Sequence, residues 1–308
     1  MYLWTVAATV ALLLPAPIRS PPYRAPTIVA CASNYAVWST IQEQAAAAST
    51  DVMAPYLSAV VTSQPTLPEG LAFCLAQKLA SDGSIPVDAL ASKLASLLGE
   101  PEVCAAVTAD LTKVVAFDPA APDLLAVFLN FKGFLALSTH RCAHALWSSQ
   151  TLYADKQLAL LLQGRASECF GVDIHPAASI GRGVFIDHAT GIVFGEQSEV
   201  GDDCYILHGV TLGATGKKDK KTGRRHPIIG SGVTIGSMAS VLGPITVGDG
   251  ATVGACATVT KSVEPGASVI DTGYMSNKVL RPKKPKAAAE KGIEIEVLGV
   301  EKVDTTDR

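Results

Sequence analysis

The sequence predicts an α+β protein in which an N-terminal α-helical domain precedes a parallel β-helix of hexapeptide repeats. Apolar residues follow helical spacing in the first half, and from Ile174 onward aliphatic residues recur every six positions, often followed by glycine. We therefore divide the chain into a targeting extension (1–35), a helical domain (36–165), a β-helix domain (166–272) and a C-terminal tail (273–308).

The composition is that of a folded, globular protein. Of 308 residues, 48% are hydrophobic and 17% are charged, whereas disordered chains are poor in apolar residues. The net charge is −3 and no long basic block stands among aromatic residues, so no nucleic-acid partner is expected. The seven cysteines form no C-x-x-C pair, which predicts reduced thiols, most of them packed as small apolar residues.

The first 35 residues differ from the rest of the chain. Val6 to Leu14 is an apolar run too short to span a membrane, so no membrane association is predicted. Arg19 and Arg24 follow it, and no acidic residue occurs before Glu43, a composition typical of organelle-targeting extensions. We expect a plastid location, with the cytoplasm or the mitochondrion as alternatives. A mis-assigned start or a disordered tail is the competing interpretation.

Residues 36–165 carry the spacing of helices separated by prolines and glycines. Asp118 followed by Pro119 predicts a helix start, because Asp accepts from free N–H groups and Pro is tolerated at the first helical position. The clearest helical repeats are Leu71, Cys74, Leu75 and Leu79, then Leu90, Leu94, Leu97 and Leu98.

The six-residue period of the second half excludes a helix, which repeats about every 3.6 residues. One hexad forms one short strand, three hexads form a triangular coil of eighteen residues, and stacked coils bury an aliphatic column. The aliphatic positions are Ile174, Ile180, Ile186, Ile192, Val200, Ile206, Leu212, Ile229, Ile235, Val241, Val247, Val253 and Val259.

Two interruptions break this period. The step from Ile192 to Val200 is eight residues, and the step from Leu212 to Ile229 is seventeen. The longer step releases a loop of residues 216–227 from the coils. Loops on a rigid scaffold often carry function, so this loop is a candidate site.

Polar residues inside the hexads form a second candidate site. Asp173 and His188 are fifteen residues apart, so eighteen-residue coils would place them about one coil apart on the same side, within side-chain reach. A carboxylate beside an imidazole makes a general base suited to removing a proton from an alcohol near neutral pH. The alternative is that His175, Asp187 and their neighbours are ordinary surface turn residues.

The motifs around these residues resemble those of the serine O-acetyltransferase family of hexapeptide-repeat acyltransferases. The resemblance implies a left-handed β-helix that transfers acetyl from acetyl-CoA to the hydroxyl of L-serine, giving O-acetyl-L-serine and CoA in the first step of cysteine biosynthesis. It implies acetyl-CoA as co-substrate, no permanently bound cofactor and no metal. The motifs are Asp173-Ile-His-Pro-Ala-Ala178, Ile186-Asp-His-Ala-Thr-Gly191, Ile206-Leu-His-Gly-Val-Thr-Leu-Gly213, Arg225-His-Pro227 and, upstream, Lys132-Gly-Phe-Leu-Ala-Leu137.

Residue by residue, the resemblance implies that His188 is the general base in direct transfer and that Asp173 orients its imidazole. The serine ammonium would bind Asp118 and Asp187, and the serine carboxylate would bind Arg225 and His226, because guanidinium pairs well with carboxylate. The acetyl-CoA contacts are implied to be Gly213, Thr215, Gly216, Ser237 and Ala255.

The resemblance further implies a homotrimer, or a dimer of trimers (a homohexamer). Each site would lie between the triangular prisms that the stacked coils of neighbouring subunits form. Many members bind O-acetylserine sulfhydrylase through a C-terminal isoleucine, but this sequence closes with Asp304-Thr-Thr-Asp-Arg308, so that partner is unsupported. Three further departures are Ala214 in place of Gly, Arg224 where Asp is common, and a longer segment at Gly273–Lys278.

Three other functions compete with this interpretation. Another hexapeptide acyltransferase with a different acceptor would keep His188 but would not need an amino-acid cradle. A zinc carbonic anhydrase on the same prism would need a close histidine pair in the coils, which the sequence spacing does not supply. A non-catalytic scaffold would not need the acid–base residues.

His140 and His144 lie four apart on a predicted helix, where packing or capping is favoured over metal binding.

Overall fold

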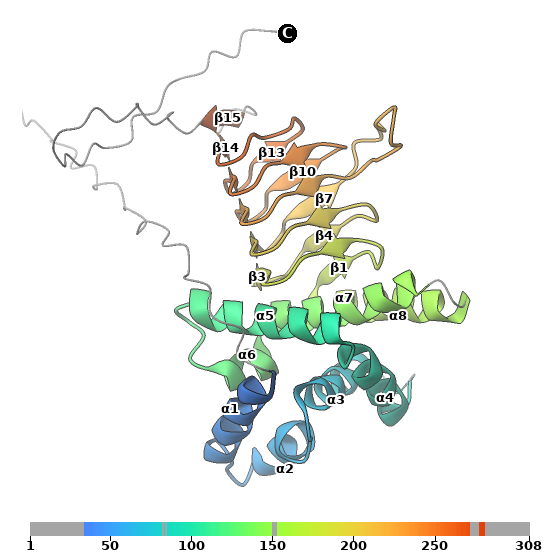
Figure 1. Ribbon diagram of the computed structural model, residues 1–308, viewed down its shortest axis with the longest axis vertical. Coiled ribbons are helices and arrows are strands. Elements are labelled where there is room, and N and C mark those ends of the chain that lie inside the picture. The colour runs from blue at the N-terminus through green and yellow to red at the C-terminus, as the bar shows by residue number, and fades with distance from the viewer. Residues whose placement is uncertain (1–33, 82, 84, 150–152, 272–276, 281–308) are drawn as a thin grey trace, which may run out of the picture. The chain divides into compact units, whose positions relative to one another are not determined.

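The computed structural model describes residues 34–271 and 277–280, except 82, 84 and 150–152. The predicted targeting extension and most of the predicted tail lie outside the described residues. The helices precede the strands (Figure 1). They are α1 (Asn34–Ala47), α2 (Ala54–Leu57), the π-helical turn η1 (Ser58–Thr62), α3 (Leu67–Leu79), α4 (Val87–Leu98), α5 (Pro101–Phe117), α6 (Leu124–Asn130), α7 (Lys132–Ser148) and α8 (Tyr153–Phe170).

Prolines and aspartates set several helix boundaries. Pro101 lies in the first turn of α5, where its missing N–H is tolerated. Asp123 caps α6, because its carboxylate accepts from the Ala126 N–H at 2.8 Å. The predicted helix start at Asp118 is wrong. Asp118 follows the end of α5 in an extended conformation, and its carboxylate accepts from the Ala120 N–H at 2.8 Å, so the Asp-Pro pair makes a turn here.

The interior of the helical region is apolar. Trp38 of α1 packs against Phe128 of α6, with ring centroids 5.6 Å apart. The cysteines among the described residues are free thiols. Those that are buried pack as small apolar residues: Cys74, Cys104, Cys142 and Cys204.

The described strands form three sheets; each of the first four coils contributes one strand to each sheet, and the last coil adds β13 and β14. The orders are β1-β4-β7-β10-β13, β2-β5-β8-β11 and β3-β6-β9-β12-β14, all parallel, with β15 antiparallel to β14. The prediction of a parallel β-helix after a helical domain is confirmed. The strands are β1 (Val172–Ile174), β2 (Ser179–Ile180), β3 (Phe185–Asp187), β4 (Ile192–Phe194), β5 (Glu199–Val200), β6 (Tyr205–Leu207), β7 (Thr211–Gly213), β8 (Ile228–Ile229), β9 (Thr234–Ile235), β10 (Ser240–Leu242), β11 (Thr246–Val247), β12 (Thr252–Val253), β13 (Thr258–Val259), β14 (Ser268–Asp271) and β15 (Asn277–Leu280).

The first coils are longer than the eighteen residues expected. Asp173 pairs with Val193 and Phe185 pairs with Tyr205, so one turn around the prism takes twenty residues here. The two extra residues lie in the turn after β3, because Ile174 pairs with Phe194 and not with Ile192, which makes the long step the one from Ile186 to Phe194. Side chains twenty positions apart therefore stack on these neighbouring coils.

The turns between strands form three edges of the prism, which we number. The first edge holds the turns after β3, β6, β9 and β12 (188–191, 208–210, 236–239 and 254–257). The second edge holds those after β1, β4, β7 and β10 (175–178, 195–198, 214–227 and 243–245). The third edge holds those after β2, β5, β8 and β11 (181–184, 201–204, 230–233 and 248–251).

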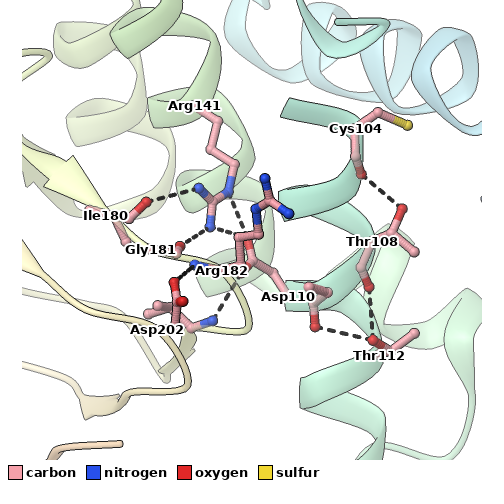
Figure 2. A network of polar contacts seen from close by, with 11 residues as sticks. Cys104, Thr108, Asp110, Thr112, Arg141, Ile180, Gly181, Arg182 and Asp202 are labelled. Atoms are coloured by element: carbon pink, nitrogen blue, oxygen red, sulfur yellow. Dashed lines mark hydrogen bonds and ion pairs between the residues drawn. The ribbon is translucent and has the colours of Figure 1, made fainter. Parts of the chain in front are cut away.

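A buried ion pair joins the helices to the third edge (Figure 2). Arg141 of α7 lies 2.7 Å from Asp110 of α5 and donates to the carbonyl oxygens of Ile180 and Gly181 at 3.2 and 2.7 Å. Asp110 also accepts from the Val184 N–H at 2.9 Å. Both charges are therefore satisfied, and α5, which ends next to Asp118, is fixed on the prism.

Candidate active site

The first edge carries the predicted general base. His188 and Ala189 follow β3 with φ of 55° and 57°, a left-handed conformation that non-glycine residues rarely adopt. The side chain of His188 is 74% exposed, and its Nε2 lies 3.7 Å from Asp187 Oδ1. This turn therefore presents an accessible imidazole beside a carboxylate.

A second histidine lies next to the first. His208 is twenty residues after His188, and their ring centroids are 5.8 Å apart in an edge-to-face arrangement. The sequence spacing offers no close histidine pair such as H-x4-H, and it is the twenty-residue coil that brings these two rings together. His208 Nδ1 is buried and has no hydrogen-bond partner in the described structure. Within the described ranges, no group of three or more His, Cys, Asp or Glu could hold a metal.

Tyr205, which the sequence did not single out, lies at the two predicted ammonium-binding carboxylates. Its hydroxyl donates to Asp187 Oδ2 at 2.7 Å, and its ring lies 5.2 Å from that of Phe117, the residue before Asp118. Burial, and then the carboxylates of Asp187 and Asp118, raise the pKa of the phenol. The carboxylates of Asp118 and Asp187 thus both lie near the Tyr205 hydroxyl.

Asp173 lies on β1 rather than at the first edge. Its carboxylate accepts from Gln163 Nε2 of α8 at 2.6 Å. In the described part of one chain, no hydrogen bond or ion pair joins Asp173 to His188. The reason is the register, which stacks Val193, five residues beyond His188, on Asp173. A functional pairing of the two residues stays a prediction.

The second edge carries the predicted carboxylate-binding residues. The guanidinium of Arg225 lies 3.0 Å from the carboxylate of Glu196, and the backbone N–H of Arg225 donates to Gln197 Oε1 at 2.8 Å. His226 is 7% exposed and packs so closely on Gly195 that an added Cβ there would overlap the ring. Burial, followed by the charge of Arg225, lowers the pKa of His226, so its imidazole is neutral near pH 7.

Arg224, one of the departures from the family pattern, holds the loop of residues 216–227 to the coils. Its guanidinium pairs with Glu199 and donates to the Gln197 carbonyl oxygen at 2.7 Å. Further out, Asp219 accepts from the backbone N–H groups of Lys221 and Thr222 at 3.0 and 2.8 Å. The base of the longer loop is therefore attached to the coil that precedes it.

The predicted acetyl-CoA contacts divide between the same two edges. Gly213, Thr215 and Gly216 lie at or next to the second edge, where Gly216 adopts a φ of 79°. Ser237 and Ala255 stack on the first edge, and the Ser237 carbonyl accepts from the Cys256 N–H at 2.8 Å. In one chain, the predicted serine-binding residues are thus divided between two edges of the prism. The predicted acetyl-CoA contacts are divided in the same way.

Comparison with known proteins matches both halves of the chain. The family Serine acetyltransferase, N-terminal, matches residues 37–139, and the family Bacterial transferase hexapeptide (six repeats) matches residues 226–261. Serine acetyltransferase 1, chloroplastic, of Arabidopsis thaliana is 46% identical over 230 residues, or 74% of this chain and 71% of the relative. The chain belongs to the serine acetyltransferase family.

Other members of the serine acetyltransferase family agree with this assignment. Arabidopsis thaliana serine acetyltransferase 3, mitochondrial, is 44% identical over 76% of this chain and 59% of its own length. The structure of soybean serine acetyltransferase complexed with serine is 39% identical, with a TM-score of 0.72, covering 79% of this chain and 97% of that one. A Brucella abortus serine acetyltransferase in complex with coenzyme A is 37% identical, with a TM-score of 0.72, covering 79% and 94%.

The remaining predictions for this acyltransferase concern residues outside the two edges. His140 and His144 contact the carbonyl oxygens of Ala178 and Pro176 at 3.1 and 2.8 Å, a packing role as expected. No helix within the described ranges is long and apolar enough to cross a membrane. The C-terminal residues 304–308 lie outside the described residues, as does most of the atypical segment 273–278.

Proposed function

We propose that this chain transfers the acetyl group of acetyl-CoA to the hydroxyl of L-serine, in the first step of cysteine synthesis from serine. The observation that carries the proposal is the complementarity of the two edges to a zwitterion. The first edge offers carboxylates for an ammonium group, at Asp187 and near Asp118, and the second offers the guanidinium of Arg225 for a carboxylate.

Because the two edges lie at different corners of one prism, the complete site requires the first edge of one copy and the second edge of a neighbour. We therefore propose a trimer whose prisms lie side by side, with two trimers forming a hexamer. The same pairing would join Gly213, Thr215 and Gly216 of one copy with Ser237 and Ala255 of its neighbour along one acetyl-CoA molecule. Each copy would then contribute to two sites.

In the proposed reaction, His188 accepts the proton of the serine hydroxyl while the serine oxygen attacks the thioester carbonyl of acetyl-CoA. The new C–O bond forms a tetrahedral intermediate, which collapses as the C–S bond breaks. The protonated imidazole returns its proton to the departing CoA sulfur. Asp187, 3.7 Å from Nε2, stabilises the imidazolium, and Asp173 is assigned the same role in the assembled site.

Release of free thiol from acetyl-CoA tests this proposal directly. The reaction is run with L-serine, L-homoserine, a galactoside and no acceptor. L-serine should accelerate release far more than the other acceptors. Equal release with all acceptors, or a preference for the galactoside, would assign the chain to another acyltransferase activity.

We further propose that residues 1–35 direct the protein to the plastid, because they are acid-poor and a similar Arabidopsis protein is described as chloroplastic. The mitochondrion is the alternative, since another relative is described as mitochondrial. Residues 1–60 fused to a fluorescent reporter should localise to plastids. Mitochondrial or diffuse cytoplasmic fluorescence would overturn the assignment.

A further inference from the structure

Tyr205 occupies an unusual position for a residue of a hexapeptide coil. It lies on β6, and its side chain is directed to the first edge by two aromatic neighbours. Its ring centroid is 5.2 Å from that of Phe117 and 5.1 Å from that of Phe185. The hydroxyl reaches Asp187 Oδ2 at 2.7 Å.

We propose that Tyr205 is a positioning residue that fixes the carboxylates of Asp187 and Asp118 for the ammonium group of the acceptor. The inference rests on the proposed function and deepens it by assigning a residue to the selection of amino-acid acceptors. Tyr205 itself need not touch the substrate.

The geometry at Asp187 supports this role. One carboxylate oxygen accepts from Tyr205, while the other lies 3.7 Å from His188 Nε2. The terminal torsion of an aspartate is otherwise broad, so a fixed donor on one oxygen selects one orientation. The raised pKa of the partly buried phenol favours its protonated form, so the hydroxyl is a donor near neutral pH.

The contact with Phe117 extends the effect to Asp118. Phe117 ends α5, and the ammonium of Lys113 lies 5.0 Å from the centre of its ring. Lys113 is itself 3.6 Å from Asp203 on the third edge. The last turn of α5 thus contacts the prism at two points, Phe117 on Tyr205 and Lys113 on Asp203.

The decisive variant is Tyr205→Phe in the full chain, which keeps the ring packing and removes only the donor. The Michaelis constant for L-serine should rise about tenfold, equivalent to about 1.4 kcal/mol, while kcat and the Michaelis constant for acetyl-CoA stay within about twofold. Tyr153→Phe is the matched control, because Tyr153 is 80% exposed on α8 and should retain wild-type constants. A merely structural role would instead lower the melting temperature and the yield of active enzyme, with both Michaelis constants unchanged.

A double-mutant cycle with Asp187→Asn isolates the hydrogen bond. If Tyr205 acts through Asp187, Tyr205→Phe should have no further effect on the serine constant in the Asp187→Asn background. Three outcomes would overturn the inference and leave the proposed function standing. They are an unchanged Michaelis constant for L-serine in Tyr205→Phe, an equal rise in the Michaelis constant for acetyl-CoA, and full additivity of the two substitutions in the cycle. A wild-type chain without serine-dependent thiol release would overturn the proposed function and, with it, this inference.

Discussion

His188 lies in a backbone conformation that most residues avoid. A left-handed φ costs a non-glycine residue about 1 kcal/mol, and here two successive residues, His188 and Ala189, adopt it. The conformation turns the imidazole outward, next to Asp187 and across from His208. Backbone strain at this position therefore exposes a candidate base that inward-facing hexad positions would bury.

His188→Asn is the cleanest test of the base, because asparagine tolerates a left-handed φ but does not accept a proton near neutral pH. We expect kcat for serine-dependent thiol release to fall at least about 100-fold, the lower range for general-base catalysis. The Michaelis constant for serine and the melting temperature should change little, since the side chain is exposed. Turnover within tenfold of wild type would rule out the assigned role.

At the scale of elements, α7 lies against β3 so closely that only glycine fits at their contact. A Cβ added to Gly133 would overlap the carbonyl oxygen of Ile186, the residue before Asp187. Gly133→Ala should destabilise the protein by about 2 kcal/mol or more, because helix and strand must separate. Gly164→Ala on α8 is the matched control: nothing lies within 4 Å of its added Cβ, and it should stabilise by up to about 1 kcal/mol. Urea unfolding of both variants measures the difference, and equal effects would contradict the close packing.

His140 of α7 makes stability depend on pH. Burial lowers its pKa to about 3, with the nearby His144 and Arg141 charges adding to the effect. The unfolded chain therefore takes up a proton below about pH 6.5 that the folded chain refuses, so stability falls as the pH falls. Between pH 6.5 and 4.5 this loss amounts to about 2 to 3 kcal/mol.

His140→Gln should flatten that part of the stability profile measured by urea unfolding at several pH values. Thr139→Val, a neighbouring buried substitution without a titrating group, should keep the wild-type slope. If the His140→Gln profile has the wild-type slope, another group carries the acid sensitivity.

At the scale of the whole molecule, the six-residue period predicted the β-helix because inward positions must be aliphatic in every coil. It did not predict which outward residues meet. The twenty-residue register stacks His208 on His188 and Tyr205 near Asp187, whereas an eighteen-residue coil would have stacked Asp173 on Gly191, three residues from His188. The two residues added in the turn after β3 shift every contact between the coil before that turn and the next coil, and beyond it the offset returns to eighteen. The aliphatic spacing showed the two extra residues but placed them after Ile192 rather than before it, because Ile192 and Phe194 are both apolar.

The division of each ligand set between two edges has a further consequence. No single prism can enclose an amino acid between Asp187 and Arg225, since they follow different faces of the β-helix. The proposed cyclic symmetry would supply the missing half, because it would place the same second edge beside every first edge. We therefore propose that the active site is assembled from two copies of the chain.

Subunit complementation tests this claim most directly. His188→Asn and Arg225→Ala chains are co-expressed with different affinity tags, and complexes carrying both tags are purified in sequence. Each variant alone should be nearly inactive, whereas mixed trimers contain sites that join an intact first edge to an intact second edge. Every mixed trimer contains one restored site in three, so doubly tagged complexes should regain from about a quarter (two randomly formed trimers paired) to about a third of the wild-type activity per site. Mixed complexes no more active than the two parent variants would contradict a site shared between copies.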